Sequence, residues 1–278
     1  MTNKIIAIQG DPIDKLDPKT DTSIFLAQEI QKKNYKIFYY YPKNLSIIES
    51  KIIAKGSFVN FNYKRKKVFK ILKKKEFDLS KCKFILIRQD PPFNLEYISS
   101  TYILDKIKDK VKILNNPTSI RNISEKLYSA KYKKFMPPTI FTQNLEEIKK
   151  FFNKNKEIIL KPIHSHGGNE IYLKMKFDLK FLKKFIKKHG YIMCQKFLPE
   201  IFKGDKRIFL INGKVCGAIS RIPKKGSFLS NLGKGAKPVI SKLTPLELKI
   251  AKMIAKDLKE EKIFFAGIDF IDQKLNGD

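Results

Sequence analysis

The feature that most constrains this chain is the alternation of short apolar segments with longer segments that have the composition of amphipathic helices. Residues 4–8 and 84–87 are short apolar runs, and each precedes an expected helix, at 22–33 and 95–106. Both runs end at Gly, Pro or Asp, which is typical of strands that lead into loops. Because strands that alternate with helices usually form a parallel sheet, we expect an α/β fold with an open sheet that is parallel in its core.

The segment Asn116-Pro117-Thr118-Ser119 separates two expected domains, because Pro117 bars a helix from continuing and Thr118 or Ser119 can cap a new one. We place the boundary near residue 120, which gives domains of residues 1–120 and 121–278. The second domain continues the alternation, with further strands expected at 139–142, 158–161, 170–173, 192–197 and 264–271, and with a long helix opened by Thr244 and Pro245 and ending near 261.

Two turns are predicted from glycine dipeptides. Asn212-Gly213 lies between apolar residues 207–211 and 214–220, and this dipeptide favours a two-residue hairpin turn. Lys55-Gly56 lies within the β-branched and aromatic stretch 52–61, which we also interpret as a hairpin.

The chain is strongly basic, with 58 Lys and Arg against 27 Asp and Glu and a formal net charge of +31. Such a charge is typical of proteins that bind nucleic acid or anionic membranes. Only five of the 58 basic residues are arginines, however, and the lysines are spread along the whole chain. Lys, Asn, Ile and Phe use A/T-rich codons, so codon bias explains the charge better than a specific nucleic-acid partner, although non-specific nucleic-acid binding stays an alternative.

The sequence favours a cytoplasmic protein with no membrane partner. Its three cysteines, Cys82, Cys194 and Cys216, are far apart, and sparse cysteines without a CxxC pair are typical of a reducing compartment. The apolar stretch at the N-terminus is too short for a signal peptide, and no run approaches the roughly 18 apolar residues that span a bilayer.

A lysine followed by a small-residue loop marks one candidate site. Lys161 ends an apolar run and precedes Pro162-Ile163-His164-Ser165-His166-Gly167-Gly168. An ammonium group beside glycines, whose backbone N–H groups can approach closely, suits a phosphate. The segment is not a Walker A loop, and a plain glycine turn is the alternative.

Acidic and basic residues in the last third of the chain mark a second candidate site. Asp205 and Arg207 open one expected strand, and Arg221 ends the next, where a buried guanidinium needs an acidic side chain or an anionic ligand. Asp269 lies in an apolar strand, on the opposite face from Ile268 and Phe270, and therefore needs a cation. In a nucleotide enzyme that cation is Mg²⁺.

Taken together, the chain resembles the bacterial glutathione synthetases, members of the ATP-grasp ligases, over its whole length. The stretches that carry the resemblance are Asp11-Pro12-Ile13, Arg88-Gln89-Asp90-Pro91-Pro92-Phe93, Ser124-Glu125-Lys126-Leu127, Ile159-Leu160-Lys161-Pro162, Gln195-Lys196-Phe197-Leu198-Pro199, Gly204-Asp205-Lys206-Arg207, Arg221-Ile222-Pro223 and Gly267-Ile268-Asp269. Their common order and spacing are more specific than any one of them.

The resemblance implies a Rossmann-like N-terminal domain and a two-lobed ATP-grasp domain, with lobes of residues 121–196 and 197–278. It implies that ATP activates the free carboxylate of γ-glutamylcysteine as an acyl phosphate, which the amine of glycine then attacks. ATP would be bound by Lys126, Lys161, Gly167, Gly168, Gln195, Lys196, Phe197, Leu198 and Asp205, with Asp205 at the ribose. Arg207 and Arg221 would be catalytic, Arg88 and Asp90 would face γ-glutamylcysteine, and Asp269 would bind Mg²⁺ or Mn²⁺. The family also implies a homo-oligomer.

The sequence departs from the family pattern in three places. His164-Ser165 stands where the family has Asp-Gly, and Leu229-Ser230-Asn231 stands where it has Arg-Gly-Asn, so that Lys224, Lys225 or Lys234 would have to supply the missing cation. The third departure is at the C-terminus, where the family continues into a hairpin with the sequence Thr-Glu-Ile-Asn. We expect Asn276-Gly277 to be a hairpin turn without a returning strand, and this 278-residue form to be impaired by truncation.

The resemblance leaves two alternatives besides nucleic-acid binding. One is another ATP-grasp ligase that joins a different carboxylate and amine. The other is a non-catalytic remnant, which nucleotide-induced thermal stabilisation would argue against.

Overall fold

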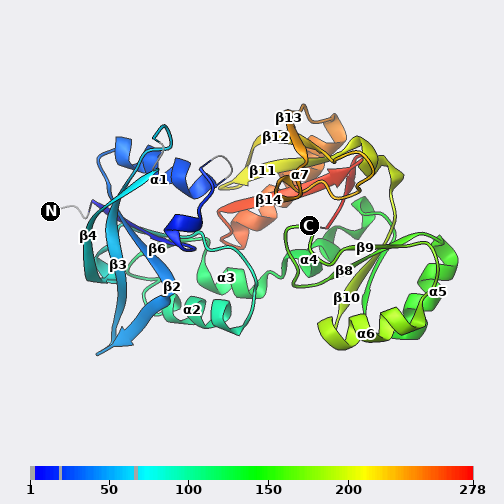
Figure 1. Ribbon diagram of the computed structural model, residues 1–278, viewed down its shortest axis with the longest axis horizontal. Coiled ribbons are helices and arrows are strands. Elements are labelled where there is room, and N and C mark those ends of the chain that lie inside the picture. Colours follow the sequence, from blue (N-terminus) through cyan, green and yellow to red (C-terminus); the bar gives the residue numbers. More distant parts are fainter. Residues whose placement is uncertain (1–3, 19–20, 66–67, 278) are drawn as a thin grey trace. The chain divides into compact units, whose positions relative to one another are not determined.

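The computed structural model describes residues 4–18, 21–65 and 68–277, and the chain forms two compact units, Met1–Asn122 and Ile123–Asp278 (Figure 1). Each unit has its own sheets and helices. The expected α/β fold is confirmed, and each unit is described by itself below.

The first unit is built on a six-stranded sheet in the order β4-β3-β2-β1-β5-β6. Pairing is parallel from β2 through β1 and β5 to β6, and antiparallel from β2 through β3 to β4. The core of the sheet is therefore parallel, as predicted, and a long antiparallel extension is added to it. The strands are β1 (Ile5–Gln9), β2 (Lys36–Ile48), β3 (Lys51–Phe61), β4 (Phe69–Asp78), β5 (Phe84–Ile87) and β6 (Lys112–Leu114).

Helices cover both faces of this sheet. Alternate residues of β2 point to opposite sides, so Tyr39 packs with Ile24 of α1 on one face while Phe38 packs with Leu104 of α2 on the other. The helices are α1 (Thr22–Lys32), α2 (Leu95–Asp105) and α3 (Pro117–Asn122), with short 3₁₀ helices at Ile13–Lys15 and Leu79–Lys81. Side chains cap α1 and α2, because Asp21 accepts a hydrogen bond from the Ser23 N–H and Asn94 accepts one from the Tyr97 N–H.

The predicted hairpin within residues 52–61 is wrong. Residues 51–61 form one strand, β3, and the chain reverses before it at Glu49 and Ser50, which have φ values of 47° and 64°. Two successive residues with positive φ make the turn whose twist fits a two-residue hairpin. Gly56 is needed for another reason: a Cβ atom there would lie 2.5 Å from the Tyr39 carbonyl oxygen.

The second unit contains two sheets (Figure 1). The four-stranded sheet has the order β7-β10-β8-β9, and α5 and α6 pack on it through Ile148 and Leu182. The elements of this part of the chain are α4 (Glu125–Tyr128), β7 (Thr139–Thr142), α5 (Leu145–Asn155), β8 (Ile158–Pro162), β9 (Tyr172–Lys174), α6 (Leu179–His189) and β10 (Ile192–Lys196), with 3₁₀ helices at Ser129–Phe135 and Pro199–Lys203.

The five-stranded sheet has the order β13-β12-β11-β14-β15 and packs against α7. Its elements are β11 (Asp205–Ile211), β12 (Lys214–Ile222), a 3₁₀ helix at Leu232–Lys234, β13 (Lys237–Ile240), α7 (Pro245–Glu260), β14 (Phe265–Ile271) and β15 (Lys274–Leu275). The predicted hairpin at Asn212-Gly213 is confirmed. The predicted start of the long helix is also confirmed, since Thr244 and Glu247 form a reciprocal capping box.

The expected hairpin turn at Asn276-Gly277 is wrong. The chain reverses earlier, at Asp272 and Gln273, whose φ values are 45° and 63°, and β15 returns antiparallel along β14. Strand β14 therefore has a partner on each side, β11 and β15.

Among the described residues, no helix has both the length and the apolar character needed to cross a bilayer.

Candidate active site

Four charged side chains meet where β11, β12 and β14 lie side by side in the second unit. The strand register places Asp205 directly opposite Arg221, and Arg207 directly opposite Asp269. Directly paired residues project from the same face of a sheet, so the register alone brings acids and bases together from three separate parts of the chain. We call these four residues the charged quartet.

Hydrogen bonds join the whole quartet. Arg207 is bidentate to Asp269, with Nε 2.7 Å from Oδ1 and Nη2 2.6 Å from Oδ2. Arg221 Nη2 lies 2.6 Å from the same Asp269 Oδ2, and Arg221 also donates to both carboxylate oxygens of Asp205, with Nε 2.8 Å from Oδ1. Arg221 therefore bridges the two acids, which satisfies the need for an anionic partner that the sequence predicted.

The four side chains of the quartet differ in their exposure to solvent. The side chains of Asp205, Asp269 and Arg221 are at most 4% exposed, whereas that of Arg207 is 31% exposed. Burial raises the pKa of Asp205, and the hydrogen bond from Arg221 opposes that shift. Arg207 is thus the member that can meet a ligand, and the buried members hold it in place.

Two lysines of the second unit are buried, which is rare for this side chain. Lys126 and Lys161 are 2% and 3% exposed. Lys126 Nζ lies 2.6 Å from the Ser165 carbonyl oxygen, and Lys161 Nζ lies 3.1 Å from the carbonyl oxygen of Asn276. Lys126 thus contacts the small-residue loop predicted to bind phosphate, and Lys161 contacts the segment that follows β15.

The small-residue loop follows β8 and meets the segment that follows β12. Gly167 and Gly168 have φ values of 64° and 73°, and a Cβ atom at Gly168 would lie 2.3 Å from Asn231 Oδ1. Lys234 Nζ donates to Asn169 Oδ1 over 2.8 Å. Lys234, one of the lysines considered as replacements for the missing arginine, therefore lies at this loop.

The residues predicted to bind adenine lie at the end of β10. Gln195 is buried and donates to Thr139 Oγ1 over 3.1 Å. The N–H groups of Lys196 and Phe197 donate to the carbonyls of Pro138 and Glu157, and Leu198 follows as the N-cap of a 3₁₀ helix. These hydrogen bonds fix the backbone of the segment that leads from the four-stranded sheet into β11.

The predicted substrate residues Arg88 and Asp90 belong to the first unit, directly after β5. Arg88 donates to the hydroxyls of Thr22 and Ser23 at the start of α1, over 2.6 and 3.3 Å. The N–H of Asp90 donates to Asp11 Oδ2 over 2.7 Å. Arg88 and Asp90 line a polar cavity of about 280 Å³ together with Lys15, Asp17 and Asp21.

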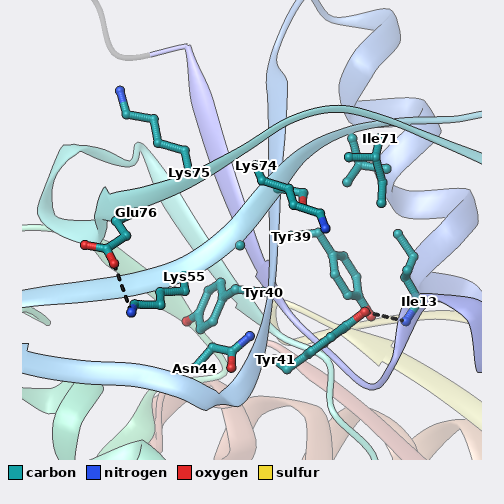
Figure 2. Close-up of a pocket in the computed structure, with 13 residues that line it drawn as sticks. Ile13, Tyr39, Tyr40, Tyr41, Asn44, Lys55, Ile71, Lys74, Lys75 and Glu76 are labelled. Carbon is teal, nitrogen blue, oxygen red and sulfur yellow. Dashed lines mark hydrogen bonds and ion pairs between the residues drawn. The ribbon is translucent and has the colours of Figure 1, made fainter.

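A larger cavity of about 590 Å³ lies against β2, β3 and β4 (Figure 2). The Tyr39 hydroxyl donates to the Asp11 carbonyl oxygen over 2.7 Å. The Tyr41 hydroxyl accepts from the Ile13 N–H over 3.3 Å (Figure 2). On its other wall Lys55 pairs with Glu76 over 3.1 Å. The two tyrosines fix the segment that contains Asp11, and Asp11 in turn holds Asp90.

The charged quartet, as arranged, does not fit a metal ion held by protein ligands. Both oxygens of Asp269 accept hydrogen bonds from guanidinium groups. In the part of the chain that the structure describes, no group of three or more His, Cys, Asp or Glu residues could hold a metal. The assignment of Asp269 to Mg²⁺ or Mn²⁺ stays a prediction.

Sequence reasoning missed three residues that complete these contacts. Ser230 Oγ donates to Asp205 Oδ2 over 2.6 Å, Asn231 packs against Gly168, and Asn276 accepts from Lys161. Ser230 stands at a position already noted as a departure from the family pattern, and Asn231 stands at the next position, which matches that pattern, so both residues carried a signal. Asn276 carried no such signal, because its role depends on the turn at Asp272 and Gln273.

The two sheets, the buried lysines, the glycine loop and the charged quartet of the second unit together define an ATP-grasp ligase. The family model described as prokaryotic glutathione synthetase, ATP-grasp domain, matches residues 125–277, and the model for the N-terminal domain of the same family matches residues 5–121. The chain belongs to the prokaryotic glutathione synthetase family. It is accordingly an enzyme, and its activity is ATP-dependent glutathione synthesis.

Individual proteins agree with this membership. A glutathione synthetase of Bradyrhizobium diazoefficiens is 35% identical over 97% of this chain and 87% of its own length. One of Escherichia coli O6:H1 is 34% identical over 97% of this chain and 87% of its own length. Among solved structures, the ATP-grasp ligase PsnB, complexed with a phosphomimetic variant of its minimal precursor, Mg and ADP, has a TM-score of 0.61 and 13% identity, covering 100% of this chain and 91% of PsnB. At that identity the likeness to PsnB concerns the fold alone.

Proposed function

We propose that this chain joins γ-glutamylcysteine to glycine in two steps. The free carboxylate of the cysteinyl residue takes the γ-phosphoryl group of ATP, giving an acyl phosphate and ADP. The amine of glycine then attacks the acyl carbon, an amide bond forms, phosphate leaves with the former carboxylate oxygen, and the amine loses a proton. The match of both family models, one to each unit, carries this proposal.

Charge neutralisation is the main task of the protein in such a reaction, because negative charge accumulates on the transferring phosphoryl group. Arg207 is the partly exposed member of the charged quartet, so we assign it to the phosphoryl oxygens and to the acyl phosphate. Arg221 is buried between Asp205 and Asp269, and we assign it to holding Asp269, and through it Arg207, in position.

Lys126 and Lys161 are assigned to the phosphates of ATP, and Gly167 and Gly168 to backbone contacts with them. Lys126 already contacts the glycine loop through Ser165, so a phosphate bound there would touch both the ammonium group and the loop. Burial strengthens such contacts, since little water competes with the anion.

The segment Gln195–Leu198 is assigned to adenine. Its backbone is fixed by the hydrogen bonds to Pro138 and Glu157, which gives a rigid edge for a planar base. Asp205 is less suited to the ribose than the resemblance implies, because its carboxylate is buried and accepts from Arg221 and Ser230. This geometry favours a positioning role for Asp205.

No step is assigned to a metal ion here. PsnB was solved with Mg and ADP, and Mg²⁺ or Mn²⁺ with ATP is the corresponding proposal for this chain.

A cytoplasmic location and a homo-oligomeric state are also part of the proposal. The free thiols of Cys82, Cys194 and Cys216 suit a reducing compartment, and light scattering measures the oligomeric state.

The test is ADP release by the purified chain with a panel of carboxylate and amine substrates, together with mass spectrometry of the product. We expect ADP release to require both γ-glutamylcysteine and glycine, with glutathione as the product. Release that prefers another acid or amine would identify a different carboxylate–amine ligase. If nucleotide does not raise the melting temperature of the chain, the chain is instead a non-catalytic remnant.

A further inference from the structure

The buried ammonium group of Lys161 is placed by the segment that follows β15. In β8, Leu160 packs on the side of α5 and α6, so Lys161 projects from the opposite face of the four-stranded sheet, directly across from Met193 of β10. Lys161 is only 3% exposed. An ammonium group that loses its hydration in this way has to be satisfied by acceptors of the protein.

Asn276 supplies two of these acceptors. Lys161 Nζ lies 3.1 Å from the carbonyl oxygen of Asn276 and 3.2 Å from its side-chain Oδ1. An amide oxygen accepts a hydrogen bond without carrying a formal charge. The two acceptors of Asn276 therefore fix the direction of the ammonium group and add no negative charge that would compete with an anionic ligand. An acidic side chain at this position would form an ion pair with Lys161 instead.

Asn276 is itself fixed by both sheets of the second unit. Its N–H donates to the carbonyl oxygen of Asp269 over 2.8 Å, which extends the pairing of β15 with β14 beyond Leu275. Gly277 follows with a φ of 73°, and a Cβ atom there would lie 2.7 Å from Met193 Cε of β10. Through Asn276, the lysine of the four-stranded sheet is joined to the strand that carries Asp269 of the charged quartet.

We propose that Asn276 is a positioning residue that orients Lys161 toward the phosphates of ATP. The inference rests on the proposed function, which assigns Lys161 to those phosphates. Because Asn276 acts through Lys161 and not on the base or the ribose, its effect depends on whether the ligand carries phosphate. A change at Asn276 should therefore weaken the binding of ADP, which has a diphosphate, and leave the binding of adenosine, which has none, as it is.

Three single variants of the purified full chain test this role. Asn276→Ala removes the Oδ1 acceptor and leaves the backbone carbonyl in place. Asn276→Asp puts a carboxylate of nearly the same size beside Lys161. Gln273→Glu makes the same change from amide to acid at an exposed position in the turn before β15, and is the matched control. Urea denaturation without ligand compares the stability of each variant with that of the unchanged chain.

Calorimetric titration measures the affinity of each variant for ADP and for adenosine in one buffer. We expect Asn276→Ala to weaken ADP binding about tenfold, as for the loss of one hydrogen bond to a charged group. Asn276→Asp should weaken it about 100-fold, because the new carboxylate pairs with Lys161 and repels the phosphates. Adenosine binding should not change, and Gln273→Glu should match the unchanged chain. Equal losses for ADP and adenosine would show that Asn276 only supports the fold, and would overturn the proposal.

A double-mutant cycle tests whether Asn276 acts through Lys161. The cycle compares Lys161→Met alone with Lys161→Met combined with Asn276→Ala, each titrated with ADP. Once the ammonium group is gone, the Oδ1 acceptor has nothing to orient, so we expect the second change to leave the ADP affinity of the Lys161→Met chain as it is. A further tenfold loss from Asn276→Ala in that chain would refute the proposal.

These titrations use neither γ-glutamylcysteine nor glycine, which separates the inference from the proposed function. ADP binding that depends on Asn276 in the predicted pattern supports the positioning role even if no glutathione forms. Turnover to glutathione with ADP binding that is indifferent to Asn276 leaves the function standing and refutes the positioning role. An unchanged chain that binds no ADP would contradict both.

Discussion

Arg221 is the residue on which the geometry of the charged quartet depends, because its guanidinium group donates hydrogen bonds to both Asp205 and Asp269. Replacing it with Met leaves two buried carboxylates close together without their shared cation. We expect Arg221→Met to lower the free energy of unfolding by about 3–5 kcal/mol, as for other broken buried ion pairs. Urea denaturation without ligand measures this, with Arg65→Met at an exposed position as control. A loss below about 1 kcal/mol would show that the quartet is not a structural unit.

Asp105 makes a pH-dependent contribution to stability. Burial acts to raise its pKa, but hydrogen bonds from Arg121 and Thr118 outweigh burial, so that the pKa is lowered from its ordinary value. A carboxyl whose pKa is lower in the folded state stabilises the fold above its unfolded pKa, and this stability is lost as the pH falls through the folded pKa. We expect Arg121→Gln to reduce stability at pH 7 and to have less effect at pH 3. An equal effect at both values, by thermal denaturation, would contradict the assignment.

The sequence predicted individual charged residues better than their partners. The alternation around Asp269 correctly separated it from Ile268 and Phe270, which pack against α7. The need of Arg221 for an anionic partner was also correct. Which acid meets which base depends on the register of β11 with β12 and β14, and that register is set by packing between segments far apart in the sequence.

At the scale of elements, the contact between the glycine loop and the segment after β12 makes the sharpest prediction. A side chain at Gly168 would meet Asn231 and would adopt a positive φ, whereas Gly226 has a positive φ of 80° with open space around it. Gly168→Ala and Gly226→Ala therefore share the backbone strain and differ in the contact. We expect only Gly168→Ala to weaken ATP binding, by about tenfold or more in calorimetric titration, a cost of roughly 1.4 kcal/mol. Equal affinities would show that the contact does not shape the ATP site.

Elements with clear local signals were predicted well. The hairpin at Asn212-Gly213 and the helix opened by Thr244 and Pro245 have turn and cap residues that strongly favour these local structures. The antiparallel extension of the first sheet was not predicted, because β4 is so rich in exposed lysines that it shows no apolar alternation. As the outer strand of its sheet it needs little apolar surface, and lysines protect such an edge from pairing with other chains.

At the scale of the whole molecule, the net charge of +31 predicts salt-sensitive, non-specific attraction to nucleic acid and nothing more. We expect the purified chain to bind DNA duplexes of different base sequence with equal affinity at 50 mM salt. This binding should fall by about 10³-fold or more at 200 mM. Fluorescence anisotropy with duplexes of different sequence measures both properties. A sequence preference that persists at 200 mM salt would show a specific nucleic-acid site.

The central claim is that the chain activates a carboxylate as an acyl phosphate before an amine attacks it. The most direct measurement uses ATP, glycine and γ-glutamylcysteine labelled with ¹⁸O in its cysteinyl carboxylate, followed by mass spectrometry of both products. The account predicts glutathione together with phosphate that carries one ¹⁸O atom for each molecule formed. Unlabelled phosphate, or ATP hydrolysis without glutathione, would contradict it.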